Sequence, residues 1–356
     1  MIADVLRGAR RYHVEAADCF DFAARIPDGV VNLLWLDGPY NMGKAAWDTF
    51  PDVGAFLAFY DRVLDVSRRI LAPNGSLYVC TSTEMGARME CKIAERFAVL
   101  NSIHWAKPPG ATKAEMFDKD TCRRFFPASE RIIFAEQFGS DGLARGEAGY
   151  IGACDEARGF IFEPLRAYLD GERERARVDK IAVNVACGFS ASPGGMASRH
   201  YFSRSQWWLP TREHYEAMRR LFNRSPDGAG EYLRRDYEEL RRPFTVSASV
   251  PYTDTWTYPT VPTQGGKHPC EKPPEMLRDV IAASSRPGDV VCELFMGSGV
   301  GGEQAALQGR RYLGCDADPE WARRALARIE RAEREPHAAG KPVRVAKAAP
   351  AQGSLL

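Results

Sequence analysis

The hydrophobic and polar positions of the first 140 residues follow two alternating periods. Short apolar runs of the strand type are separated by segments whose apolar residues recur at helical spacing. The strand-type runs cover residues 30–37, 76–82, 99–107 and 130–138, and the helical segments cover residues 52–71 and 85–97. The tetrapeptide "APNG" at 72–75 predicts a turn before the second of these strands. Alternation of this kind predicts an α/β fold with a mostly parallel sheet covered by helices.

The pattern changes in the middle of the chain and then returns. From about residue 139 to residue 242 strand signals are scarce and charged helical segments dominate, with two short helices expected within 163–188. A further helix is expected after Thr211, whose side chain suits an N-cap. A compact inserted module of helix-turn-helix type fits these segments, and so does a helical lid. After Val250 the elements resume as helix 273–285, strand 289–295, glycine loop 296–302, helix 303–309, strand 310–316 and helix 319–335.

Composition is that of an ordinary globular protein, with 45% hydrophobic residues and a formal net charge of +1. The chain has no apolar run long enough to span a membrane, and its N-terminus lacks the apolar core of a signal peptide, which predicts a cytoplasmic protein. The nine cysteines are scattered singly, so we expect buried thiols and no metal site. The tail after Glu335 is rich in Ala, Pro, Gly and Lys and is predicted to be disordered.

Two stretches carry candidate chemistry at the ends of predicted strands. The strand within 30–37 ends in Asp37, Gly38, Pro39 and Tyr40, at the edge where parallel sheets bind ligands. The second stretch is a glycine loop between a strand and a helix, in which backbone N–H groups face an approaching ligand. Asp316 ends the next strand, where a carboxylate can accept hydrogen bonds from a ribose.

The glycine loop alone also suits a dinucleotide oxidoreductase. Such a domain needs further strand–helix units after the strand that ends at Asp316, and here only one helix and a tail follow. The rest of the sheet must therefore come from the N-terminal half. A nucleotide-type site would be assembled from both ends of the chain.

With "DGPY" early and "FMGSG" late, the chain resembles the amino-methyltransferases of DNA in their β-type motif order. Asp37-Gly38-Pro39-Tyr40 is similar to the family's Asp-Pro-Pro-Tyr motif, and residues 293–299 are similar to its Asp-Pro-Phe-x-Gly-Ser-Gly motif. The segment "KHPCEKPPEMLRDVI" resembles the family's His-Pro-x-x-Lys-Pro element. Although "HPCEK" also has a superficial likeness to zinc deaminases, the second cysteine of their motif is missing.

The resemblance implies a Rossmann-like methyltransferase fold with permuted motif order and an inserted, mainly helical target-recognition domain. It divides the chain into a catalytic half (1–140), the insert (141–245), a cofactor half (246–335) and a tail (336–356). The implied cofactor is S-adenosylmethionine, with Lys272 and His268 near its carboxylate and Asp18 near its adenine. The residues expected to bind it are Asp18, His268, Lys272, Glu293, Phe295, Gly297, Ser298, Gly299 and Asp316.

The implied reaction explains the Asp-Gly-Pro-Tyr stretch. The amine of adenine is a poor nucleophile because its lone pair is delocalised into the ring. A carboxylate from Asp37 and the backbone carbonyl of Gly38 can accept both amino hydrogens, Pro39 stiffens the turn, and Tyr40 can stack on a base flipped out of the duplex. Two departures from the family motif are noted: Gly38 is expected to loosen the loop, and Glu293 is longer than the usual Asp.

The segments "FFPASERIIFAE", "SQWWLP", "VPYTDTWTYP" and "GKHPCEKP" resemble those of prophage-type adenine methylases, some of which have low sequence specificity. Double-stranded DNA is the expected partner, with contacts from Arg199, Arg204, Arg219 and Arg220 in the inserted region. Trp207 and Trp208 suit base stacking or, more often, packing within such a module. Methylation of cytosine N4 is the main alternative, RNA or protein glutamine methylation is more distant, and a DNA-binding regulator with a vestigial catalytic domain is an alternative of another class. The sequence leaves open a homodimer and the biological role.

Overall fold

The computed structural model of this chain describes most of the α/β elements and the helical insert. The described residues are 1–108, 120, 123, 125–138, 163–203, 207–245, 253–262, 268 and 270–334. The predicted disordered tail, Arg204 and Gln206 lie outside them, as do residues 139–162.

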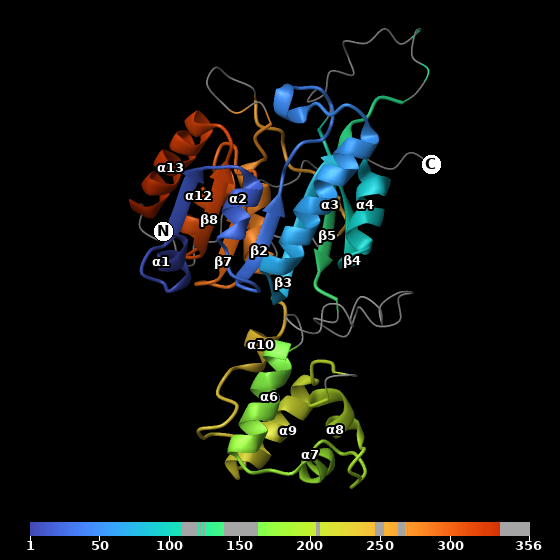
Figure 1. The fold of residues 1–356 in the computed structure, drawn as a ribbon, viewed down its shortest axis with the longest axis vertical. Coiled ribbons are helices and arrows are strands. Elements are labelled where there is room, and N and C mark those ends of the chain that lie inside the picture. The colour runs from blue at the N-terminus through green and yellow to red at the C-terminus, as the bar shows by residue number, and fades with distance from the viewer. Residues whose placement is uncertain are drawn as a thin grey trace, which may run out of the picture.

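One sheet organises the larger part of the molecule (Figure 1). Within the described residues it has eight strands, in the order β1-β8-β7-β2-β3-β5-β4-β6. β5 is antiparallel to both of its neighbours, and all other pairs are parallel. The strands are β1 (Tyr12–Ala16), β2 (Val31–Leu36), β3 (Leu71–Ser82), β4 (Ala98–Ala106), β5 (Ser129–Glu136), β6 (Thr255–Trp256), β7 (Val290–Glu293) and β8 (Arg311–Asp316).

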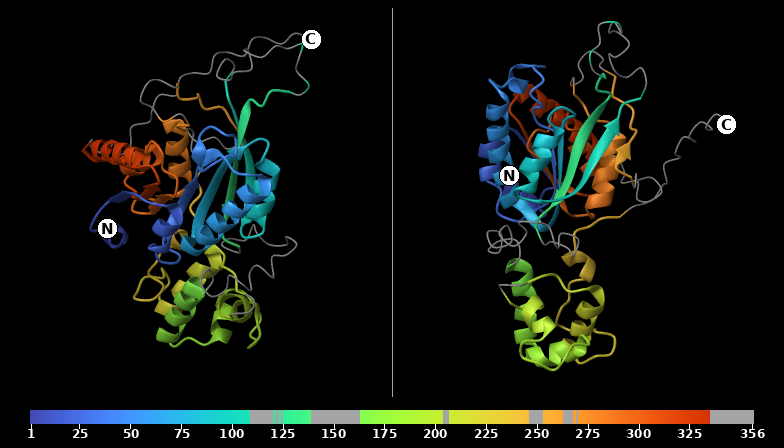
Figure 2. Two further views of the ribbon diagram at one scale, coloured as in Figure 1. Left: turned by 45° about the horizontal axis from the view of Figure 1, so that its top comes forward. Right: turned by 90° about the vertical axis from the view of Figure 1, so that its right-hand side faces the viewer.

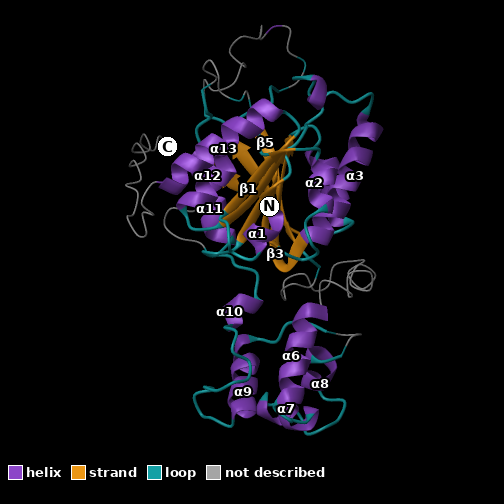
Figure 3. Ribbon diagram, turned by 60° about the vertical axis from the view of Figure 1, so that its left-hand side comes forward, coloured by secondary structure: helices purple, strands orange, loops and turns teal. Residues whose placement is uncertain are grey.

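Helices cover both faces of this sheet (Figure 3). One face packs against α1 (Ile2–Leu6), α2 (Cys19–Ala24), α3 (Val53–Ile70) and α4 (Gly86–Ala94). The other face packs against α11 (Pro274–Ser284), α12 (Val300–Leu307) and α13 (Pro319–Arg334). Side chains of β2 alternate between the two layers, with Leu34 and Leu36 on the first side and Leu33 and Trp35 on the second. The predicted α/β class with a mostly parallel sheet is confirmed.

Two predicted boundaries are wrong. Residues 72–75, predicted as a turn, lie inside β3, where the β2–β3 register shifts between the pairs Val31–Leu71 and Leu33–Ser76. The turn residues are accommodated as an irregularity within a long strand. The glycine loop is also shorter than predicted, because α12 begins at Val300 and includes Gly301 and Gly302. A Cβ on Gly302 would lie 2.4 Å from Ile329 Cδ1 and 2.8 Å from the Tyr312 ring, so α12 packs closely against α13 and β8 at this glycine.

The insert forms a helical lobe with its own core (Figure 2). The core includes Leu169, Val183, Tyr215, Met218 and Phe222. The lobe consists of α6 (Glu163–Arg175), α7 (Lys180–Ala186), α8 (Met196–Tyr201), α9 (Arg212–Asn223) and α10 (Tyr237–Leu240).

Local contacts in the lobe agree with two sequence interpretations. The Thr211 hydroxyl accepts the His214 N–H at the start of α9, which confirms the predicted cap. Trp207 is buried and donates to the Tyr201 carbonyl, while Trp208 stacks on His200, so this pair packs within the module.

The lobe joins the sheet at the amino-terminal edge of the parallel strands. The Asn74 side chain, in the irregular part of β3, donates to the backbone carbonyls of Glu239 and Arg241. The buried Arg242 guanidinium pairs with Glu136 at 2.5 Å, where the antiparallel β5 ends beside the start of β3. In Figure 1 the lobe accordingly hangs below the sheet.

Burial of the cysteines is mostly as expected. Cys19, Cys80, Cys187, Cys292 and Cys315 are buried free thiols, whereas Cys91 is exposed on α4, contrary to the prediction. Within the described part of the chain, no helix is long and apolar enough to cross a membrane.

Candidate active site

Asp37 lies at the carboxyl end of β2, where the strand leaves the sheet. Its carboxylate faces a cavity of about 310 Å³. The same cavity is lined by the glycine-loop residues Gly297 and Ser298 and by Glu293. The two stretches singled out in the sequence therefore meet in one cavity, although they are more than 250 residues apart in the chain.

One oxygen of Asp37 carries two hydrogen bonds. Lys272 Nζ lies 2.6 Å from Asp37 Oδ1, and the Tyr40 hydroxyl lies 2.9 Å from the same atom. No described protein group donates to Oδ2 within hydrogen-bonding distance. One carboxylate oxygen is therefore held by the protein, and the other is left as an acceptor for a group in the cavity.

Glu130, at the start of β5, is a member of this cluster that sequence reasoning missed. It lies 2.6 Å from Lys107 Nζ, 3.3 Å from Lys272 Nζ and 3.0 Å from the Tyr40 hydroxyl. Burial alone would raise the pKa of Glu130, but Lys272 and Lys107 outweigh it and lower the pKa to about 2. No local signal distinguishes Glu130, because Arg131 and Glu136 of the same strand are charged as well.

The sequence resemblance placed Lys272 at the cofactor's carboxylate, whereas the structure places it between two protein carboxylates. Its side chain is only 5% exposed. Burial alone would lower the pKa of Lys272, but Asp37 and Glu130 raise it above its ordinary value. The ammonium is therefore charged and is shared by Asp37 and Glu130.

A buried carboxylate shapes the loop after Tyr40. Asp48 is 1% exposed and accepts the backbone N–H groups of Tyr40, Met42 and Lys44 at 2.6, 3.1 and 3.1 Å. These bonds close the segment from Tyr40 to the short 3₁₀ helix η1 (Ala46–Asp48). Asp48 could not be selected from the sequence, because its role depends on the folded path of the loop that brings three N–H groups to its carboxylate.

Gly38 was expected to loosen the turn from Asp37 to Tyr40, but the structure packs it tightly. A Cβ at this position would lie 2.9 Å from the Phe295 ring and 2.9 Å from the Tyr60 hydroxyl. The Tyr60 hydroxyl also donates to the Pro39 carbonyl at 2.9 Å. Gly38 is thus required by close packing, and the turn is fixed from both sides.

Tyr40 is largely enclosed, with 7% of its surface exposed. Burial, followed by the charges of Asp37 and Glu130, raises the pKa of Tyr40 well above its ordinary value, so its hydroxyl remains a donor. Lys272 Nζ lies 5.2 Å from the ring centroid, a cation–π distance. The ring lines the cavity.

The glycine loop adopts a conformation that only glycine tolerates easily. Gly297 and Gly299 have φ angles of 49° and 75°, in the left-handed region. Asp316 Oδ2 accepts the Gly297 N–H at 2.9 Å, and Oδ1 accepts the Asp318 N–H at 3.0 Å. Asp316 therefore holds the loop and keeps further lone pairs for a ligand.

The other predicted cofactor residues lie around the same edge. Asp18 follows β1 and caps α2 by accepting the N–H groups of Phe20 and Asp21. His268 packs edge-on against Trp321, with ring centroids 4.7 Å apart, and borders Gly297. Burial lowers the pKa of His268, so the ring is neutral near pH 7.

These residues fit S-adenosylmethionine. Gly297 and Ser298 line the cavity, and Asp316, which accepts the Gly297 N–H, can also accept hydrogen bonds from a ribose. The same cavity reaches Asp37, so a methyl donor held at the loop would lie next to the Asp37 carboxylate.

Glu293 is buried beneath the glycine loop. It is 3% exposed and accepts the Tyr312 hydroxyl at 2.7 Å. Burial raises the pKa of Glu293 to about 8; the Tyr312 hydrogen bond opposes this rise and the charge of Asp37 adds to it. The carboxyl is therefore mostly protonated at neutral pH.

The arginines predicted to bind DNA are not brought to this cavity. Arg199, Arg219 and Arg220 lie on α8 and α9 of the helical lobe, which joins the opposite edge of the sheet. Arg204 lies outside the described residues. Along β5, Glu130 at the cavity and Glu136 at the lobe junction are six residues apart, or about 20 Å.

Comparison with known proteins gives consistent matches over most of the chain. The profile of the N6/N4 methylase family, described as "DNA methylase", matches residues 31–327. Type II methyltransferase M1.MboII of Moraxella bovis is 23% identical over 315 residues, covering 88% of this chain and 94% of that protein. Type II methyltransferase M2.DpnII of Streptococcus pneumoniae is 22% identical over 333 residues, covering 88% of each.

Among solved structures, the cytosine-N4-specific PvuII DNA methyltransferase shares the fold. Its TM-score is 0.51 at 12% sequence identity, and the match covers 90% of this chain and 86% of that one. The predicted Rossmann-like methyltransferase architecture is confirmed at this level.

The buried carboxyl of Glu293 generates a pH prediction. Between the ordinary pKa of 4.5 and about 8, folded Glu293 holds a proton that the unfolded chain has released. Raising the pH through this window therefore lowers the free energy of unfolding, and the loss ends above the folded pKa. Urea unfolding of wild type and Glu293→Gln at pH 6, 7, 8 and 9 measures the effect. The variant is expected to gain stability relative to wild type as the pH rises, and a constant difference would contradict the assignment.

Proposed function

Since the chain belongs to the N6/N4 DNA methylase family, we propose that it transfers a methyl group to the N6 amine of adenines in double-stranded DNA. S-adenosylmethionine supplies the methyl group when it is bound. The observation that carries the proposal is the Asp37 carboxylate. Its Oδ1 is hydrogen-bonded by Lys272 and Tyr40, and its Oδ2 is left as an acceptor in a cavity that the glycine loop also lines.

Asp37 and Gly38 would orient the amine. Asp37 Oδ2 accepts one amino hydrogen and the Gly38 carbonyl accepts the other, which favours a more tetrahedral nitrogen with its lone pair directed at the methyl carbon. Lys272 and Tyr40 hold Oδ1, so the carboxylate cannot rotate freely. The contribution of the protein is therefore largely alignment of the reacting groups.

The first residue of the motif favours adenine over cytosine as the proposed target base. In the resembling family, Asp at this position is typical of adenine enzymes and Ser of cytosine enzymes, and Asp37 occupies it here. Cytosine N4 remains the alternative, because its amine needs the same two acceptors. Nuclease digestion of treated DNA followed by mass spectrometry separates N6-methyladenine from N4-methylcytosine.

Relaxed sequence specificity is supported by the amides of the insert. Base reading commonly uses Asn or Gln side chains with free donors and acceptors. The described amides between residues 140 and 240 are occupied within the lobe: Asn184 bonds Ser192 and Ser198, and Asn223 bonds three backbone carbonyls. Two relatives are named type II methyltransferases, which supports methyl transfer as the activity of this chain.

We expect Asp37→Ala to abolish methyl transfer while cofactor affinity changes by less than about twofold, because Asp37 meets the base rather than the loop. The matched variant Asp316→Ala should instead weaken S-adenosylmethionine binding, by about 1–3 kcal/mol, because charged hydrogen bonds to the cofactor are lost. Radiolabel transfer to DNA and calorimetry with the cofactor measure the two effects. Near wild-type transfer by Asp37→Ala would refute the assigned role.

We also expect methylation in many sequence contexts. Single-molecule sequencing of plasmid treated with excess enzyme should show modified adenines without one short common motif. Modification confined to a single motif at high enzyme excess would show that the chain reads sequence tightly. No modification at all, with the cofactor bound, would favour the alternative of a DNA-binding regulator.

A further inference from the structure

We propose that DNA is held mainly by an aromatic and basic rim on the carboxyl edge of the sheet, and not by the helical lobe. The active-site rim is defined as Met42, Lys44, Trp47 and Phe125. The inference rests on the proposed function and names the surface that receives the strand carrying the target base.

Exposed apolar side chains gather at this edge. The described residues include nine large hydrophobic side chains that are exposed, and four of them are Met42, Trp47, Phe125 and Phe126. Trp47 is 50% exposed and lines the cavity that contains Asp37. Met42, Phe125 and Phe126 line a second cavity of about 790 Å³ that shares Tyr40 with the first. Such clustering around a catalytic cavity marks an interaction surface.

Trp47 stands on a rigid support. It precedes Asp48, whose carboxylate binds three backbone N–H groups of the catalytic loop, and the Asp48 carbonyl accepts the Gly43 N–H at 3.1 Å. The backbone position of Trp47 relative to Asp37 is thereby set by the loop that follows Tyr40. An exposed aromatic ring carried on such a backbone suits stacking on a base beside the extruded one.

A cation accompanies these rings. Lys44 lines both cavities, and its Nζ lies 5.9 Å from the Tyr40 ring centroid, whereas the neighbouring Lys107 is paired with Glu130. A lysine beside exposed aromatic rings matches a nucleic-acid strand, since bases stack on the rings while phosphates meet the ammonium group. Neither contact depends on base identity, in keeping with relaxed specificity.

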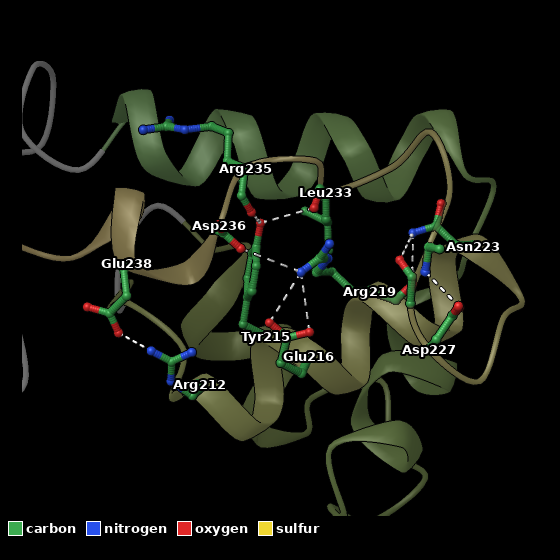
Figure 4. A network of polar contacts seen from close by, with 12 residues as sticks. Arg212, Tyr215, Glu216, Arg219, Asn223, Asp227, Leu233, Arg235, Asp236 and Glu238 are labelled. Atoms are coloured by element: carbon green, nitrogen blue, oxygen red, sulfur yellow. Dashed lines mark hydrogen bonds and ion pairs between the residues drawn. The ribbon is translucent and has the colours of Figure 1, made fainter. Parts of the chain in front are cut away.

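The helical lobe is less suited than the rim to be the main DNA-binding surface. Many of its arginines are paired with carboxylates of the lobe itself. Figure 4 shows Arg212 directed at Glu238, and Arg219 directed at Glu216 and Asp236. The other such pairs join Arg166 to Glu163 and Asp170, Arg173 to Asp170, Arg175 to Glu172 and Arg235 to Glu239.

The position of the lobe matters as well as its charge. Its contacts with the sheet lie at the amino edge, through Asn74 and Glu136, whereas the rim lies at the carboxyl edge. A duplex that presents a base to Asp37 thus meets the rim first.

The test compares rim and lobe variants of the full chain. Trp47→Ala tests the rim, Trp47→Phe keeps a stacking ring, and the double variant Arg199→Ala/Arg220→Ala is the lobe control. The probe is a fluorescein-labelled duplex with a mismatch opposite one adenine, titrated by anisotropy in the presence of a non-reactive cofactor analogue. Trp47→Ala should weaken binding about 10-fold, Trp47→Phe should restore most of it, and the lobe variant should change it less than about threefold.

The outcomes separate this inference from the proposed function. If the wild-type protein binds the cofactor but methylates no DNA, the proposed function is refuted regardless of the DNA affinities of the variants. Wild type that methylates DNA, with unchanged affinity in Trp47→Ala, would overturn the rim. Loss of binding in the lobe variant by 10-fold or more would also overturn it, because the proposal assigns the main contact to the rim. Unchanged thermal unfolding and cofactor affinity in each variant exclude misfolding as the cause.

Discussion

The contact between Asp37 and Lys272 joins the two halves of the α/β domain. The two residues are 235 positions apart, and their side chains are 16% and 5% exposed. Removing one partner of such a pair leaves a buried charge, which is costly. Here the same contact also orients the Asp37 carboxylate, because Lys272 binds one oxygen and the other is left as the acceptor that the proposed reaction requires. Glu130 and Lys107 extend the pair into a neutral group of two acids and two bases.

The sheet separates this site from the helical lobe. Residues at the carboxyl ends of the strands provide the turn from Asp37 to Tyr40, the glycine loop and Asp316, while the lobe is attached at the amino ends. β5 runs from one region to the other: Glu130 at its start belongs to the charged cluster, and Glu136 at its end pairs with Arg242 at the lobe. An insertion that is large in sequence can therefore leave the active-site edge open to DNA.

Much of the fold and part of the site could be predicted from the sequence. The strand and helix periods were clear because buried layers impose them, and the two motifs were identifiable because a strand end and a glycine loop have local signatures. Glu130, Asp48 and the packing role of Gly38 were not identifiable in this way. Glu130 depends on Lys272 and Gly38 depends on Phe295, and both partners are distant in the chain. Asp48 depends on the path of the folded loop that it closes. The bulge at residues 72–75 escaped prediction because a turn signal does not tell whether the strand continues through it.

The role of Lys272 tests the account most directly, since the sequence resemblance assigns it to the cofactor and the structure assigns it to Asp37. The measurement is the single-turnover rate of methyl transfer by Lys272→Met at saturating cofactor and DNA, together with the dissociation constant for S-adenosylmethionine. The account predicts a rate lower by about 100-fold with the dissociation constant changed less than about twofold, because orientation of the carboxylate is lost and the cofactor site is intact. A wild-type rate with markedly weakened cofactor binding would contradict the account and show that Lys272 binds the cofactor.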